Sequence, residues 1–285
     1  MEYILEVESL RKSYNNFVLD DISFSLHKNS ITGFIGTNGS GKTTTIKLIL
    51  GLALKDYGSI RLFGKDISKC EREVKNRIGV VLDEGYLYDD LTINEMKSIV
   101  APSYNNWDDT LFYRNIESFK LQKNQKISSL SKGMRMKFSI ALAISHHAEL
   151  LIMDEPTSGL DPLVRSDLLK ILSDFMEDGK SVFFSTHITS DLDKIADRLI
   201  LINKGQIIFS EEKKILFEKY AKVSGNIKEL TESNRKLFFS INNYGDSFQG
   251  ITNSIESVRQ SFADSIIEKP TIEEIMLSKI GGTQV

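Results

Sequence analysis

Short apolar runs alternate with longer amphipathic stretches along the chain, and this pattern predicts a mixed α/β fold. Two β-rich segments, residues 3–10 and 18–30, flank the turn-like sequence YNN and are expected to pair as strands of one sheet. The run "SITGFIG" (30–36) is typical of a short buried strand, and "KTTTIKLILGL" (42–52) has apolar residues at helical spacing. The sequence therefore predicts a strand, a loop and a helix in succession.

The spacing of apolar residues becomes helical in the middle of the chain, and strand-like runs follow it. Between about residues 87 and 147 the apolar residues follow the helical period, as in "TINEMKSIV" and "SKGMRMKFSIALAISHH". Strands are then expected in "ELLIMDE" (149–155) and "KSVFFSTH" (180–187), with the amphipathic "PLVRSDLLKILSDFME" between them. Such an alternation is typical of a parallel sheet, so we expect a helical insert that divides an α/β core.

The last part of the chain is expected to be a separate extension. "DRLILINKGQIIFS" predicts a hairpin with Lys204 and Gly205 at its turn. Beyond it, "KLFFSI" and "SFADSIIEKP" are expected to be strands of a small α+β unit. Thr271 and Glu274 form a capping-box pattern before a short helix that stops at Gly281. This extension either completes the fold by packing or serves dimer contact or regulation.

The expected division into domains follows from these patterns. One large domain covers residues 1–210, made of a core (1–86 and 148–210) and a helical subdomain (87–147), and the extension covers 211–285.

Composition and charge exclude several classes of protein. The 285 residues are 41% hydrophobic and 26% charged, which is typical of a globular chain, and a mixed-sign net charge of −3 does not favour nucleic acid as a partner. Cys70 is the one cysteine, so an internal disulfide is excluded. No apolar run approaches the roughly 18–20 residues of a membrane span, and the N-terminus lacks the pattern of a signal peptide. We therefore expect a cytoplasmic chain. We also expect three histidines at the surface, namely His27, His146 and His147.

The segment "GTNGSGKT" fits the pattern G-x-x-x-x-G-K-[ST] in the strand, loop and helix context that a phosphate-binding loop requires. Its residues are Gly36, Thr37, Asn38, Gly39, Ser40, Gly41, Lys42 and Thr43, with Thr44 next in the helix. Glycine lets backbone N–H groups approach phosphate oxygens, and the helix dipole adds partial positive charge. Lys42 is expected at the β- and γ-phosphates and Thr43 on Mg²⁺, so we predict a nucleotide site.

Two carboxylates at the end of a later strand are expected to lie close to this nucleotide site. The apolar run 150–153 ends in Asp154, which places a carboxylate at the carboxyl edge of the sheet, where α/β folds bind ligands. Asp154 is expected to hold the water shell of the metal, and Glu155 to accept a proton from the attacking water. A helix-capping pair is the alternative for this segment taken alone.

Three further motifs carry a resemblance to a known family. "LSKGM" (130–134), "ELLIMDEPTSGLD" (149–161) and "STH" (185–187) resemble the motifs of an ATP-binding cassette (ABC) ATPase, in matching order over residues 1 to about 210. The resemblance implies a phosphate-loop NTPase (RecA-like) core, with an N-terminal antiparallel β subdomain and the helical insert, that binds and hydrolyses ATP.

The same resemblance implies that two chains work as a homodimer or a heterodimer. Ser131 and Gly133 of one chain would then close over the ATP held by the loop of the other. Lys132 and Met134 depart from the commonest residues of this signature. Taken alone, "LSKGM" is more typical of a serine N-cap before a helix.

The resemblance to ABC ATPases also implies roles for three single residues. The resemblance implies that His187 senses the γ-phosphate beside Glu155, that Tyr14 stacks on adenine, and that Asp161 contacts the partner subunit. A histidine after a strand or a tyrosine beside a turn is otherwise unremarkable, so these assignments rest on the resemblance.

The informative departure lies in "IGVVLDEGYLYDDLT" (78–92). The family usually has a glutamine here that contacts Mg²⁺, and this chain has Asp83, or Glu84 if the alignment shifts by one residue. An acidic residue at this place resembles bacterial ATPases of antibiotic or peptide exporters that have separately encoded membrane subunits. The implied function is ATP-driven export through a transmembrane permease, from a peripheral position on the inner face of the cell membrane.

Two other functions stay open at the level of the sequence. A soluble cassette ATPase in protein or cofactor assembly would carry the same motifs. An unrelated phosphate-loop enzyme such as a kinase would need an acceptor site, and no segment suggests one.

Overall fold

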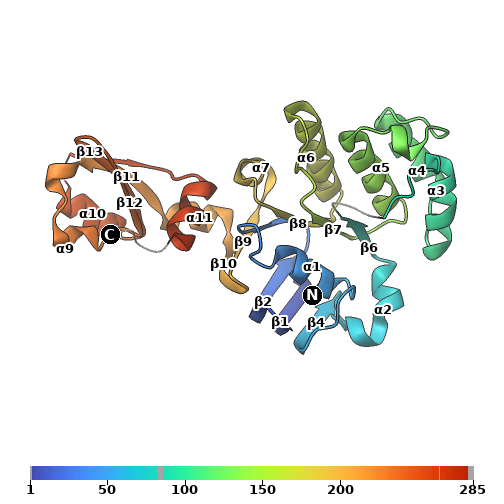
Figure 1. Cartoon of the computed structure of the whole chain (residues 1–285), viewed down its shortest axis with the longest axis horizontal. Helices are drawn as coiled ribbons and strands as arrows, with labels where there is room; N and C mark the ends of the chain where they lie inside the picture. Colours follow the sequence, from blue (N-terminus) through green and yellow to red (C-terminus); the bar gives the residue numbers. More distant parts are fainter. Residues whose placement is uncertain (1, 83–85, 263, 282–285) are drawn as a thin grey trace.

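The computed structural model describes residues 2–82, 86–262 and 264–281, so Asp83 and Glu84 lie outside the described residues. Figure 1 shows an α/β body with a group of helices on one side of it and a smaller sheet-and-helix unit on the other. The expected α/β class is confirmed. Among the described helices, none combines the length and the apolar character needed to cross a bilayer.

An antiparallel sheet near the N-terminus forms the first layer. Its strands are β1 (Tyr3–Tyr14), β2 (Phe17–His27), β4 (Tyr57–Leu62) and β5 (Lys65–Asp66), and within the described residues their order is β2-β1-β4-β5. The predicted pairing of the first two segments is confirmed, because β1 and β2 are antiparallel with Tyr14 opposite Phe17. The helix α2 (Ile67–Lys75) follows this sheet.

A mainly parallel sheet forms the centre of the molecule. Its strands are β3 (Ile31–Ile35), β6 (Ile78–Val81), β7 (Leu150–Asp154), β8 (Ser181–Thr186), β9 (Arg198–Asn203) and β10 (Gln206–Glu212). Their order in the described part of the chain is β10-β9-β3-β8-β7-β6, and only the β9–β10 pair in it is antiparallel. The predicted parallel sheet and the predicted hairpin are therefore both confirmed.

Successive side chains of the central strands point to opposite faces of the sheet and pack into two separate apolar cores. Leu151 and Met153 of β7 pack on one face, under α6 (Pro162–Glu177) and α7 (Thr189–Ile195). Leu150 and Ile152 pack on the other face, against α1 (Lys42–Ile49) and the antiparallel sheet. Figure 1 shows α6 and α7 on one side of this sheet and α1 on the other. Burial on both faces explains why these strands are continuous apolar runs.

The predicted helical insert has its own apolar core. Its helices are α3 (Ile93–Val100), α4 (Asp109–Ser118) and α5 (Lys132–Ile144), with short 3₁₀ turns at Ala101–Ser103 and Ile127–Ser129. Phe112 and Phe138 are fully buried between them. Thr92 and Glu95 form a capping box at the start of α3, which satisfies backbone N–H groups that the helix leaves unpaired.

The expectation that His146 lies at the surface is wrong. Its side chain is buried, stacks on Tyr104 with ring centroids 3.7 Å apart, and places Nε2 3.1 Å from the carbonyl oxygen of Ile78. Burial disfavours the charged imidazole and lowers the pKa of His146 to about 4. A neutral His146 therefore joins the end of α5 to strand β6.

The C-terminal extension is a small α+β unit, as expected. It contains α8 (Lys213–Lys219), β11 (Ala221–Asn226), a 3₁₀ turn (Ile227–Glu229), α9 (Glu232–Arg235), β12 (Ser240–Tyr244), β13 (Ser247–Thr252), α10 (Ile255–Ser261), β14 (Ile266–Glu268) and α11 (Ile272–Ile280). The strand expected at 236–241 begins only at Ser240, because Phe238 turns into the core of this unit beside Phe248 and Phe262. The capping box of Thr271 and Glu274 and the stop at Gly281 are confirmed.

The last helix packs on the central body as well as on its own sheet. Ile272, Ile275 and Met276 of α11 belong to the same apolar cluster as Leu192 and Ala196 next to β3. In Figure 1, α11 lies between the C-terminal sheet and α7. The extension is thus attached through buried apolar side chains.

This attachment predicts a large stability effect at one position of α11. Replacing Ile275, whose side chain is 1% exposed, by alanine should cost about 2–5 kcal/mol of the free energy of unfolding, because it leaves a cavity. Urea denaturation measures the loss. The matched control is Leu277→Ala in the same helix, where the side chain is 54% exposed and little change is expected. Equal effects of the two substitutions would show that α11 is not packed as described.

Candidate functional site

The glycine-rich loop connects β3 to α1, as the motif requires. Gly39 and Gly41 have positive φ angles of 76° and 113°, which favour glycine. A Cβ atom at Gly36 would lie 2.4 Å from the carbonyl oxygen of Ile202 and 2.5 Å from Ser40 Oγ, so a side chain does not fit there. Residues 37–39 are exposed, whereas Ser40 and Lys42 are buried beneath them. The loop therefore offers its backbone to a ligand.

Neighbouring backbone holds the loop in this shape. The N–H of Gly205, in the β9–β10 turn, donates to the carbonyl of Ser40 at 2.9 Å, and the N–H of Asp20 donates to the carbonyl of Gly205 at 2.9 Å. The Thr45 hydroxyl donates to the carbonyl of Gly41 at 2.9 Å. Thr43 is exposed at the start of α1, and Thr44 is partly exposed.

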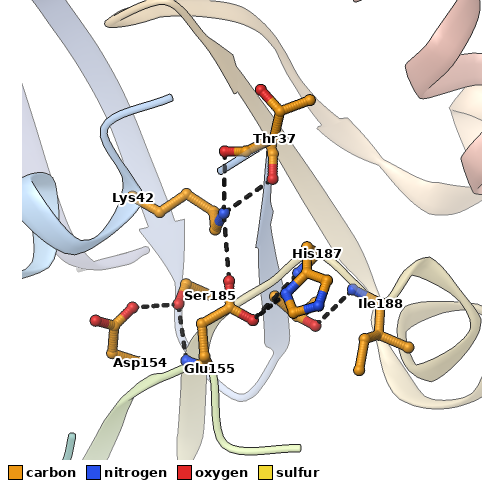
Figure 2. A network of polar contacts seen from close by, with 9 residues as sticks. Thr37, Lys42, Asp154, Glu155, Ser185, His187 and Ile188 are labelled. Atoms are coloured by element: carbon orange, nitrogen blue, oxygen red, sulfur yellow. Dashed lines mark hydrogen bonds and ion pairs between the residues drawn. The ribbon is translucent and has the colours of Figure 1, made fainter. Parts of the chain in front are cut away.

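The two predicted carboxylates come directly at the end of β7. Asp154 is the last residue of this strand and pairs in register with Ser185 of β8. The Ser185 hydroxyl donates to Asp154 Oδ1, and the N–H of Glu155 donates to the same hydroxyl oxygen at 2.9 Å (Figure 2). Glu155 has a φ of 49°, an unusual value for a residue with a side chain. This turn separates the directions of the two carboxylates.

Lys42, Glu155 and His187 form a polar network across three segments (Figure 2). Lys42 Nζ lies 3.2 Å from Glu155 Oε1 and donates to the carbonyls of Gly36 at 2.8 Å and Thr37 at 3.3 Å. His187 Nδ1 lies 2.7 Å from Glu155 Oε2 and must carry the proton, because a carboxylate only accepts. The side chains of Lys42 and Glu155 are 6% and 15% exposed, so water screens their attraction less than it screens a surface pair.

Ser131 and Gly133, the residues of the predicted signature, lie apart from this network. Ser131 is the N-cap of α5 and accepts from the N–H of Met134 at 3.3 Å. Gly133 faces α6, where a Cβ atom would lie 2.5 Å from Val164 Cγ1. Within the described part of the chain, neither Ser131 nor Gly133 is hydrogen-bonded to residues 36–44.

The other predicted site residues have separate positions. Tyr14 is the last residue of β1 and is 47% exposed, with Lys12 Nζ 5.6 Å from the centroid of its ring. Asp161 caps α6 by accepting from the N–H groups of Leu163 and Val164 at 3.1 Å.

One residue of the network was not identified from the sequence. Ser185 ends an apolar run and is fully buried, yet its hydroxyl contacts both Asp154 and Glu155. The sequence shows only a serine at the end of an apolar run, and its pairing with Asp154 appears only in the structure.

The residues present suit Mg²⁺ better than a metal held only by protein. Within the described ranges no group of three or more His, Cys, Asp or Glu side chains could hold a metal ion. Mg²⁺ typically takes one or two carboxylates together with substrate phosphates and water. Asp154 and the hydroxyl of Thr43 are donors of the right kind near the loop.

Comparisons with known proteins agree with this geometry. A family model described as ABC transporter matches residues 19–158. The bacitracin transport ATP-binding protein BcrA of Enterococcus faecalis is 34% identical over 240 residues, covering 83% of this chain and 73% of the relative. The linearmycin resistance ATP-binding protein LnrL of Bacillus subtilis is 34% identical over 211 residues, covering 72% of this chain and 68% of the relative.

Solved structures extend the likeness to the fold. The structure of an ATP-binding subunit of an ABC transporter has a TM-score of 0.69 and 26% identity, covering 75% of this chain and 92% of that one. An ATP-binding cassette of an ABC transporter in its ADP conformation has a TM-score of 0.66 and 25% identity, covering 75% and 93%. The chain therefore belongs to the ABC transporter family, as an ATP-binding subunit that is an ATPase.

Proposed function

We propose that this ATPase subunit powers export of an antimicrobial or amphipathic compound through a separately encoded membrane subunit. The energy-converting part of this proposal rests on one observation: Lys42 of the phosphate loop and His187 both contact one carboxylate, that of Glu155, directly after β7. The names of the relatives, bacitracin transport and linearmycin resistance, support export of such compounds. In this proposal the ATPase domain is residues 1–210, with the extension at 211–285, and the chain is peripheral on the inner face of the cell membrane.

The loop and the first turn of α1 bind the phosphates of ATP. Backbone N–H groups of residues 36–43 and the positive end of the α1 dipole attract phosphate oxygens, and Lys42 adds a full charge. The exposed ring of Tyr14 stacks on adenine, an interaction worth about 1–3 kcal/mol per base.

Thr43, Asp154 and Asp83 are the proposed ligands of Mg²⁺ or of its water shell. When bound, Mg²⁺ neutralises charge on the β- and γ-phosphates. Asp154 is suited to this role because its Oδ1 is held by the Ser185 hydroxyl, which fixes the carboxylate.

Glu155 is the proposed general base. Phosphate oxygens compete with its carboxylate for Lys42, whose Nζ lies 3.2 Å from Oε1. Transfer of Lys42 to the phosphates leaves Oε1 to accept a proton from the attacking water. His187 keeps the carboxylate oriented through Nδ1–H. In the imidazolium form, in which both ring nitrogens are donors, Nε2–H would donate to an oxygen of the γ-phosphate.

Ser131 and Gly133 act on the ATP of a second ABC ATPase, either another copy of this chain or a different subunit. Their position at the start of α5, away from the loop of their own chain, supports this head-to-tail arrangement. The start of a helix suits a γ-phosphate, because N–H groups and the dipole point toward the anion.

An apolar groove supports docking of the membrane subunit. It measures about 370 Å³ and lies between the core and the helical insert. Leu52 and Val80 line it from the core, and Met96 and Leu142 line it from the insert. We assign this groove to a helix of the membrane subunit.

The phosphate loop can be tested by removing its charge. Lys42→Ala should weaken ATP binding by about 10- to 100-fold, because charge-assisted hydrogen bonds are worth about 1.5–3 kcal/mol. Titration with a fluorescent ATP analogue measures the affinity. Lys47→Ala, at an exposed position of the same helix, is the matched control and should bind as the unmodified chain does. Unchanged affinity in Lys42→Ala would contradict the assignment of the loop.

The export function is tested by identifying the partner. Glu155→Gln should bind ATP without hydrolysing it and hold the closed dimer. Purification of this tagged variant with ATP from detergent-solubilised native membranes should recover a polytopic membrane protein, identified by mass spectrometry. Recovery of soluble proteins alone would favour the runner-up function, a soluble ABC ATPase in protein or cofactor assembly.

The groove can be tested in the same purification. Leu52→Ser, made in the Glu155→Gln background, should lower the recovery of the membrane protein by at least about tenfold, since it removes apolar contact area. Leu54→Ser is the matched control, because Leu54 is 84% exposed, two residues further on, and does not line the groove. Equal recovery with both variants would place the docking surface elsewhere.

A further inference from the structure

We propose that Ser185 is a positioning residue that sets the relative geometry of Asp154 and Glu155 for ATP hydrolysis. The inference rests on the proposed function, in which Asp154 serves Mg²⁺ and Glu155 serves the attacking water. Ser185 acts through these two residues.

The hydroxyl of Ser185 makes one hydrogen bond to each of them. It is fully buried at the level of Asp154 in the β7–β8 pair. Because Asp154 Oδ1 accepts the one hydroxyl proton, the hydroxyl oxygen faces the N–H of Glu155 as an acceptor, at 2.9 Å. A single group thus fixes the side chain of one residue and the backbone of the next.

The backbone of Glu155 needs such support. Its φ of 49° lies in the left-handed region, which is strained for a residue with a side chain and persists only when the surroundings impose it. The N–H of Glu155 also donates to the carbonyl of Ser185, at 3.2 Å. Two acceptors from one residue therefore hold Glu155 in the conformation that directs its carboxylate to Lys42 and His187.

Only a hydroxyl side chain can perform both tasks in this space. Alanine would remove one of the two acceptors of the Glu155 N–H, leaving only the backbone carbonyl, and would leave Asp154 Oδ1 buried without its donor. Asp154 could then rotate, and the metal and the general base would lose their fixed separation. Threonine keeps the donor and the acceptor.

The chain provides a matched control on the same strand. Ser181 is buried at the opposite end of β8, 2% exposed, and its Oγ accepts from the N–H of Asn29 at 2.9 Å. Ser181→Ala and Ser185→Ala therefore make the same substitution in the same strand, and each removes buried hydrogen bonding. Ser181 touches none of the site residues named above, so it reports the cost to stability alone.

The experiment compares steady-state ATP hydrolysis of Ser185→Ala, Ser185→Thr and Ser181→Ala over a range of Mg²⁺ concentrations, with the thermal midpoint of each. Ser185→Ala should lower kcat by about 10- to 100-fold, with KM for ATP changed less than about threefold, because misplacement by about 1 Å costs rate more than binding. It should also raise the Mg²⁺ concentration needed for half-maximal rate. Ser185→Thr should recover most of kcat, and Ser181→Ala should keep it within about twofold at a similar thermal midpoint.

Several outcomes would overturn the proposal. Normal kcat in Ser185→Ala would do so, as would equal losses of kcat in Ser185→Ala and Ser181→Ala. Failure of the hydroxyl-bearing Ser185→Thr variant to exceed Ser185→Ala would also argue against the two hydrogen bonds. Glu155→Gln, assayed in parallel, distinguishes failure of the proposed function from failure of the positioning role. Full turnover in Glu155→Gln would refute Glu155 as the general base. An inactive Glu155→Gln together with a normal kcat in Ser185→Ala would refute only the positioning role of Ser185.

Discussion

Parallel pairing of β3, β8 and β7 is the constraint on which the site depends. Parallel strands end at one edge of a sheet, so the phosphate loop after β3, the carboxylates after β7 and His187 after β8 meet there although they are far apart in sequence. The register is specific enough to place Ser185 opposite Asp154. Because both faces of these strands are buried, a shift by one residue would exchange the two cores, and the packing therefore maintains the register.

Charge is concentrated at that edge in a nearly balanced form. Lys42 is buried with an acceptor on each side, the loop carbonyls and Glu155, so its charge is not left uncompensated. A buried pair of this kind is weak evidence for stability, since desolvation offsets much of the attraction. In the proposed function this pair has a functional role, because phosphate oxygens would take the place of the carboxylate at Lys42.

Much of the fold and most of the site could be predicted from the sequence. The phosphate loop is a contiguous motif, and the strands around Asp154 and His187 are apolar enough to be identified by composition alone. The strands β4 and β6 were missed, because Gly58 and Arg61 interrupt the first and the second has four residues. Burial of His146 could not be predicted, since it depends on Tyr104, more than 40 residues away. The role of Ser185 depends likewise on pairing between strands that no local pattern reveals.

The close approach of α7 to β3 has a consequence for cooperativity. Gly33 in β3 has no side chain, and a Cβ atom there would lie 2.2 Å from Leu192 of α7, while α11 packs on the same cluster. The helix that follows His187 is thus enclosed between the strand that leads into the phosphate loop and the last helix of the extension. Local opening of any one of these segments exposes apolar surface of the others, so they form one unit of unfolding. We therefore expect β3 and α11, which lie far apart in the sequence, to be coupled in stability through the seven residues of α7.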